Sequence, residues 1–159
     1  MSDNLRQYRA IREALRQAYP GEPQGRCARH LTTLAAMISG IVASKSTQLP
    51  HVAAKVSDGA KPESRVKRFA RWLDNARILE EVYFLPYAEI LLAHLAVKTL
   101  VLVMDGSVVG CGCVALMIHV LYKGRALPLA WRVRQGPKGH FPEALHIVLV
   151  ELVRACLPE

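Results

Sequence analysis

The fold of this chain is decided by the stretch Leu100-Val101-Leu102-Val103-Met104-Asp105-Gly106-Ser107. Five consecutive apolar residues before an Asp-Gly turn signal predict a strand that is buried on both faces and ends at Asp105. A carboxylate at the tip of a buried strand has lost much of its hydration, so it needs a compensating partner. Two interpretations are open. Asp105 caps a neighbouring backbone N–H in a turn, or it is a hard oxygen ligand for Mg²⁺.

Three more elements are expected after this strand. The apolar run of residues 114–122 predicts a second strand, and Lys123-Gly124 predicts a hairpin turn because glycine adopts positive φ without steric cost. A third strand is expected over residues 126–134, and Pro128 within it indicates an edge position. Residues 143–157 then have the spacing of an amphipathic helix.

The N-terminal part is expected to be helical throughout. Apolar spacing predicts helices over residues 5–19, 26–43 and 47–56, with Thr47 as a cap, and a fourth helix that begins at Pro62. A fifth helical stretch covers residues 76–96 and is interrupted at Leu85-Pro86. The predicted fold class is therefore α+β, with a helical region in residues 1–98 and a sheet-containing region in residues 99–159.

The helix that begins at Pro62 carries a candidate binding face. Its apolar face is expected to consist of Val66, Phe69, Ala70 and Leu73. The cations fall on the opposite side or at its border, and they are Arg65, Lys67, Arg68 and Arg71. This charge run is either a solvated face or a surface that contacts the phosphates of DNA.

The charge of the chain is unevenly distributed. It carries 21 Lys and Arg against 13 Asp and Glu, which gives a net charge of +8 and an isoelectric point near 9.6. Residues 26–77 hold ten Lys or Arg and three acids, whereas residues 100–159 hold six and four. A polyanionic partner is therefore expected to bind to the helical region.

Two long segments resemble a known family. Residues 102–143 read LVMDGSVVGCGCVALMIHVLYKGRALPLAWRVRQGPKGHFPE, and residues 46–75 read STQLPHVAAKVSDGAKPESRVKRFARWLDN, followed by FLPYAEILLAHLA at residues 84–96. Together they resemble bacterial insertion-sequence transposases of the DDE type, whose catalytic domain has an RNase H-like fold. The resemblance covers nearly the whole chain, and both word order and spacing agree.

This resemblance implies DNA cleavage and strand transfer at transposon ends, with two Mg²⁺ ions held by two Asp and one Glu. Only the first carboxylate can be carried over, onto Asp105, as a catalytic and metal-binding residue. The chain is therefore expected to be an N-terminal fragment with the first three strands and first helix of the RNase H-like domain, and to bind metal weakly or not at all. The expected partners are double-stranded DNA and an intact or complementing transposase chain.

A catalytically inactive DNA-binding module that competes with an intact transposase is the alternative function. The N-terminus lacks a secretory signal, and Lys98, Asp105 and several Gly and Ser residues interrupt the apolar stretch of residues 90–120. The four cysteines show no disulfide or zinc spacing. We therefore expect a cytoplasmic protein that makes no membrane contact.

Overall fold

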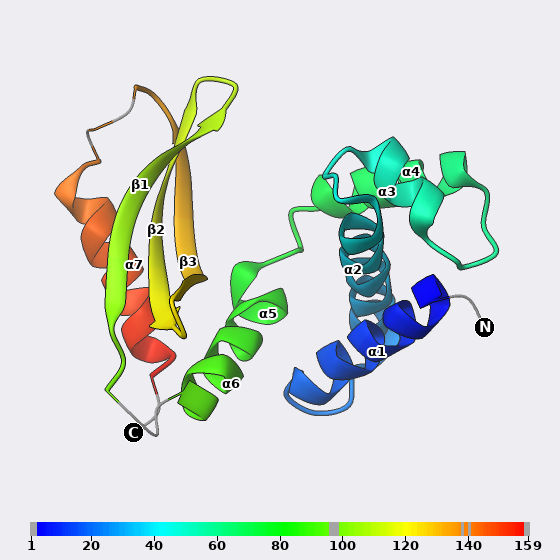
Figure 1. Ribbon diagram of the computed structural model, residues 1–159, viewed down its shortest axis with the longest axis horizontal. Helices are drawn as coiled ribbons and strands as arrows, with labels where there is room; N and C mark the ends of the chain where they lie inside the picture. Colours follow the sequence, from blue (N-terminus) through cyan, green and yellow to red (C-terminus); the bar gives the residue numbers. More distant parts are fainter. Residues whose placement is uncertain (1–2, 96–98, 138, 140, 158–159) are drawn as a thin grey trace. The chain divides into compact units, whose positions relative to one another are not determined.

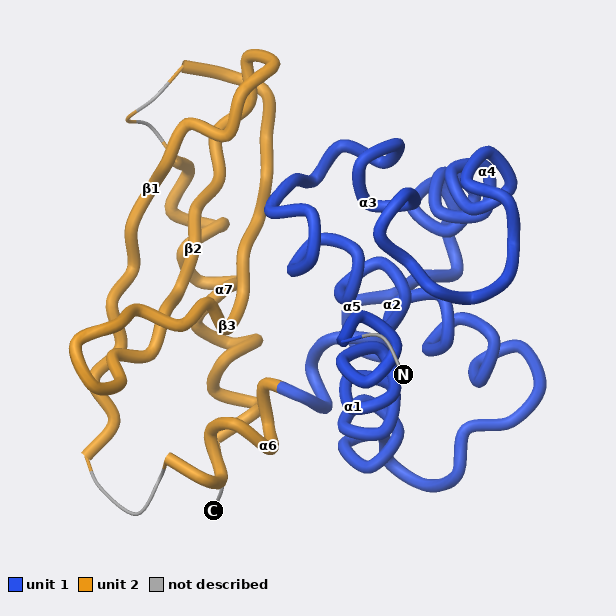
Figure 2. The backbone as a smooth tube through the Cα atoms, turned by 45° about the vertical axis from the view of Figure 1, so that its right-hand side comes forward, with its two compact units in different colours: residues 1–87 blue, residues 88–159 orange. Residues whose placement is uncertain are grey.

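The computed structural model describes residues 3–95, 99–137, 139 and 141–157. The chain divides into two compact units, which we call the helical unit (residues 1–87) and the sheet unit (residues 88–159) (Figure 2). Helices together with an antiparallel sheet confirm the predicted α+β class. The predicted boundary at residue 98 lies outside the described residues.

From residue 3 onward, the helical unit consists of five helices and the first turn of a sixth. They are α1 (Asp3–Ala18), α2 (Gly25–Ser44), α3 (Leu49–Lys55), α4 (Pro62–Leu73), α5 (Glu80–Tyr83) and the start of α6 (Leu85–Leu95) (Figure 1). The C-cap of α2 is Lys45, which takes a left-handed conformation with φ of 53° and donates its N–H to the carbonyl of Ile41. The fifth predicted helix is interrupted at Phe84, so that Pro86 lies in the first turn of α6, where its missing N–H costs nothing.

The core of the helical unit joins α2, α3 and α4. It contains Ala36, Met37, Val52, Ala53, Val56 and Phe69, all buried. α2 and α3 approach closely because Gly40 has no side chain. A Cβ at Gly40 would lie 2.6 Å from Cγ1 of Val52 and 2.7 Å from the carbonyl oxygen of the same residue. The three helices therefore share one core, which includes the ring of Phe69.

Three sequence-based expectations for these helices are wrong in detail. The N-cap of α3 is Gln48 rather than Thr47, and it makes no side-chain capping hydrogen bond. Leu73, which was expected on the apolar face of α4, is 56% exposed, because it lies in the last turn beyond the reach of the core. Arg65, which was placed at the border, is buried at 8% exposure.

In its described residues, the sheet unit contains three antiparallel strands in the order β1-β2-β3. They are β1 (Leu102–Gly110), β2 (Cys113–Tyr122) and β3 (Arg125–Gln135), and α7 (Glu143–Ala155) packs against β2 and β3 (Figure 1). The turn between β2 and β3 is the predicted one, with φ of 48° at Lys123 and 75° at Gly124. Three strands followed by a helix is the expected order of elements.

β1 differs from its predicted form. It does not end at Asp105 and is not buried on both faces. Asp105 lies within the strand, pairs with Met117 of β2 and is exposed. Gly106 continues the strand rather than starting a turn: it pairs with Leu116 of β2, and the ring of Phe141 packs over it. A Cβ at Gly106 would lie 2.6 Å from Cε2 of Phe141.

The two outer edges of this sheet are built differently. β3 carries Pro128, which lacks an N–H, and an unpaired Leu129 next to it where the register with β2 shifts. Such features block pairing with another strand. β1 is regular from Leu102 to Val108, and Val103 is 39% exposed along it. Among the described strands, β1 is therefore the edge that is open to pairing with another chain.

We predict that Val103→Lys lowers self-association of the full chain, since a charge on an open edge opposes strand pairing. The measurement is the apparent mass from light scattering as protein concentration rises. Val133→Lys is the matched control, because Val133 is 55% exposed on the protected strand β3. An equal effect of the two substitutions would show that general surface apolarity, not the β1 edge, causes association.

Candidate nucleic-acid interface

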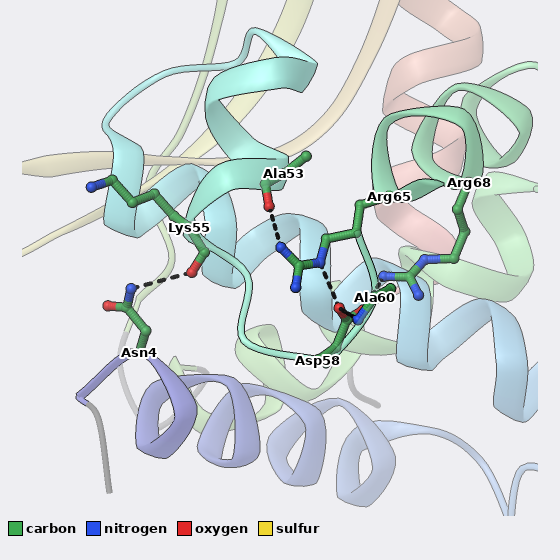
Figure 3. Close-up of polar contacts among 7 residues, drawn as sticks. All are labelled: Asn4, Ala53, Lys55, Asp58, Ala60, Arg65 and Arg68. Atoms are coloured by element: carbon green, nitrogen blue, oxygen red, sulfur yellow. Dashed lines mark hydrogen bonds and ion pairs between the residues drawn. The ribbon is translucent and has the colours of Figure 1, made fainter. Parts of the chain in front are cut away.

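Arg65 of α4 is an internal residue of the helical unit. Its side chain is 9% exposed, and its Nε donates to Oδ1 of Asp58 at 2.5 Å. Nη1 donates to the carbonyl oxygen of Ala53 in α3 at 2.8 Å (Figure 3). The guanidinium therefore links α4 both to the preceding loop and to the preceding helix.

Arg68 binds the other carboxylate oxygen of Asp58. Its Nη2 lies 2.5 Å from Oδ2, and its guanidinium lies 5.3 Å from the centre of the Phe69 ring. Oδ1 of Asp58 also accepts the backbone N–H of Ala60 at 3.2 Å. We call Asp58, Arg65 and Arg68 the Asp58 clamp, because together they fix the loop of residues 56–61 to α4 (Figure 3).

The ionisation of Asp58 reflects this clamp. Burial of the carboxyl group alone would raise its pKa, but hydrogen bonds from Arg68 and Arg65 and from the N–H of Ala60 outweigh it and hold the pKa below its ordinary value of 3.8. The carboxylate is therefore charged at neutral pH. One Asp carboxylate between two guanidinium groups leaves a net charge of +1 at the clamp.

The four cations proposed for DNA contact thus separate into two pairs. Arg65 and Arg68 belong to the Asp58 clamp, and only Arg68, with a side chain that is 37% exposed, reaches solvent. Lys67 and Arg71 are exposed and lie one turn apart on α4, where Nε of Arg71 donates to the carbonyl oxygen of Lys67 at 3.1 Å. Of the four cations that the sequence predicted for DNA contact, Lys67 and Arg71 are therefore the two that lie fully in solvent.

The same face of α4 also carries acids. Glu63 in the first turn and Asp74 at the C-cap are both exposed. Two cations and two acids on one face cannot act as a strong phosphate-binding surface. The positive charge that could attract DNA must come mainly from other parts of the helical unit.

That charge is provided by cations outside α4, which sequence periodicity did not single out. Each is exposed, and they are Arg26, Arg29, Lys45, Lys55, Lys61 and Arg77. With Lys67 and Arg71 they give eight exposed cations in residues 26–77, against Glu63 and Asp74 as the exposed acids. The sequence signal for these cations is the ratio of ten cations to three acids in residues 26–77. In the structure, the excess of exposed positive charge is larger than this ratio suggests, because Asp58, the third acid, is paired with Arg65 and Arg68.

His30 and Tyr83 form a second polar cluster in the helical unit. Nδ1 of His30 lies 2.7 Å from the hydroxyl oxygen of Tyr83, and Nε1 of Trp72 donates to the carbonyl oxygen of His30 at 3.2 Å. Burial, and then the charges of Arg26 and Arg29, lower the pKa of His30, while burial raises the pKa of Tyr83 to about 12. Both groups are neutral at pH 7, and they tie α2 to α4 and α5.

Asp105 lies on a different kind of surface. Oδ1 accepts the N–H of Gly106 at 2.7 Å, so the carboxylate caps a neighbouring backbone group as the first interpretation of the sequence proposed, though within a strand rather than a turn. Among the residues the structure describes, no three His, Cys, Asp or Glu side chains come close enough to hold a metal ion. Asp105 supplies one carboxylate, whereas protein-bound Mg²⁺ usually takes one or two carboxylates and completes its coordination with waters and substrate phosphates.

No family model, no curated protein and no solved structure matches the chain. The transposase assignment therefore stays a prediction from the sequence resemblance. Within the described part of the chain, the helices are too short or too polar to cross a bilayer.

We predict that Asp58→Asn lowers the free energy of unfolding of the helical unit by about 3 kcal/mol, because it leaves the buried Arg65 guanidinium without its counter-charge. Asp74→Asn is the control: this acid is exposed at the end of the same helix, and its replacement should cost less than about 0.5 kcal/mol. The measurement is urea unfolding followed by circular dichroism.

The Asp58 clamp also gives stability a pH dependence with a defined sign. Because the folded pKa of Asp58 lies below its unfolded value of 3.8, the contribution is complete well above that unfolded value and is lost as pH falls through it to the lower, folded pKa. The Asn variant should lack this component. Equal losses for Asp58→Asn and Asp74→Asn would show that the clamp does not hold the loop.

Proposed function

We propose that this chain binds duplex DNA through its helical unit. The observation that carries the proposal is the charge that faces solvent in residues 26–77, where eight exposed cations stand against two exposed acids. Cations on a rigid scaffold release counterions from the phosphate backbone, and this release supplies most of the affinity for DNA without sequence preference. The packed core of α2, α3 and α4 is such a scaffold.

We further propose that the chain is the N-terminal part of an insertion-sequence transposase of the DDE type. The sequence resemblance supports this assignment, and so does the order of three antiparallel strands and a helix, with Asp105 on the first strand. In this proposal the sheet unit is the beginning of an RNase H-like domain, and Asp105 is the first of its three carboxylates. The open edge of β1 is then a place where an intact or complementing transposase chain can pair.

The second candidate function is a DNA-binding module that does not cut DNA. It is favoured by the surroundings of Asp105: Oδ1 accepts the N–H of Gly106, and among the described residues no group of three metal-ligating side chains includes this carboxylate. Such a chain would occupy transposon ends and compete with an intact enzyme.

The test of the proposed function is the salt dependence of duplex binding by the full chain. Lys55 and Lys61 are exposed at the two ends of the loop that joins α3 to α4. If both contact phosphates, replacing them with Ala should lower the slope of log affinity against log salt by about 1.8.

The control removes the same charge from the sheet unit, at Arg125 and Arg134, both exposed on β3. This double variant should keep the wild-type slope. An equal decrease in both double variants would place DNA binding on the overall charge of the chain rather than on the helical unit, and the proposal would fail.

For catalysis we predict that Asp105→Ala leaves duplex affinity within about twofold, because its carboxylate lies in the sheet unit and would repel phosphates rather than bind them. We also expect no strand cleavage by the chain alone with Mg²⁺ or Mn²⁺. Both are measured on labelled duplexes by gel. Metal-dependent nicking that Asp105→Ala abolishes would instead favour an active enzyme over the DNA-binding module.

A further inference from the structure

We propose that the turn between β1 and β2 binds a soft, two-coordinate metal ion of the Cu(I) class through the thiolates of Cys111 and Cys113. The site lies in the sheet unit, so it is independent of the DNA binding proposed for the helical unit.

The two cysteines lie on a tight turn of defined form. Gly110 of β1 pairs with Cys113 of β2, so Cys111 and Gly112 are the two loop residues of the hairpin. Their φ angles of 52° and 69° have the signs of a type I′ turn, in which Gly, Asn and Asp are the favoured residues. The geometry of the turn therefore gives no reason for a cysteine at position 111.

Packing does not explain this pair of cysteines either. A free cysteine usually behaves as a small, buried apolar residue. Cys156 at the end of α7 is of this kind, because it is buried and its Sγ donates to the carbonyl oxygen of Leu152 at 3.3 Å. Cys111 is exposed and Cys113 is half-buried, so the pair lies at the surface of the sheet unit instead.

The turn is held in place on two sides. Besides its pairing with β1, Cys113 pairs with Gln135 of β3, and the N–H of Gly136 donates to the carbonyl oxygen of Gly112 at 3.0 Å. Sγ of Cys113 donates to the carbonyl oxygen of Cys111 at 3.7 Å, so this thiol lies against the backbone of the residue that carries the other one. Two thiols on one fixed turn can bind the same ion with little ordering of the chain.

The number and kind of ligands select the ion. Thiolates prefer soft ions such as Cu(I), and they also bind Zn²⁺. A structural Zn²⁺ takes four protein ligands, whereas among the described residues no three His, Cys, Asp or Glu side chains are grouped. Cu(I) is satisfied by two thiolates in a linear arrangement. The pair of Cys111 and Cys113 therefore fits a two-coordinate soft ion rather than a tetrahedral one.

The test is titration of the reduced full chain with Cu(I) under argon, in competition with a chromogenic Cu(I) chelator. Wild type should bind one ion per chain. Cys111→Ser and Cys113→Ser should each lower the affinity by about a hundredfold or more, because the second thiolate of a linked pair acts at a high effective concentration. Cys27→Ser is the matched control: it removes a half-buried thiol from the helical unit and should leave the affinity unchanged.

Cys111→Asn separates metal binding from folding. Asn suits a left-handed turn position, so this variant should keep or raise the melting temperature of the metal-free chain while it loses the ion. Retention of Cu(I) by the folded Asn variant would overturn the proposal. So would an equal loss of affinity in Cys27→Ser, which would place the ion elsewhere, or a ratio of one ion to two chains, which would mean that thiols of two copies hold it.

Discussion

The geometry of the helical unit depends on one buried charge, the guanidinium of Arg65. A cation that is 9% exposed must be paired and hydrogen-bonded, or the unit would pay several kcal/mol for its desolvation. Asp58 and the carbonyl oxygen of Ala53 provide the partners. Since these partners come from the loop and from α3, satisfying one side chain of α4 fixes the positions of both.

The Asp58 clamp also determines which charges of the helical unit are exposed to solvent. Asp58 is one of only three acids in residues 26–77, and the clamp withdraws it from the surface. The clamp also withdraws Arg65 from solvent almost completely and Arg68 in part. The charge that remains exposed in residues 26–77 is therefore strongly positive. A single structural ion cluster therefore stabilises the fold and at the same time leaves a basic surface of six cations outside α4, while α4 itself has a mixed face.

Sequence reasoning succeeded where one residue type dictates the local backbone. Gly124 after Lys123 gave the β2–β3 hairpin, and Pro20-Gly21 lies just beyond the end of α1. Sequence reasoning failed where a residue distant in the sequence determines the burial or the backbone conformation of a position. The buried role of Arg65 depends on Asp58 and Ala53, and periodicity placed it only at the border of a face. Asp-Gly at Asp105 reads as a turn in isolation, yet Gly106 pairs with Leu116 of β2 and so continues the strand, with the ring of Phe141 packed over it.

In the sheet unit, too, the exposure of each strand depends on elements that are distant from it in the sequence. Leu102, Val103, Met104 and Ile118 line a groove of about 350 Å³ together with Val153 and Leu157 of the C-terminal segment. Val103 and Trp131 are 39% and 37% exposed. α7 packs against β2 and β3, whereas the apolar side chains of β1 are those of a strand with neighbours on both sides. The edge of β3 is protected and the edge of β1 is not. A further strand can therefore pair with this sheet beside β1, the strand that carries Asp105, and not beside β3.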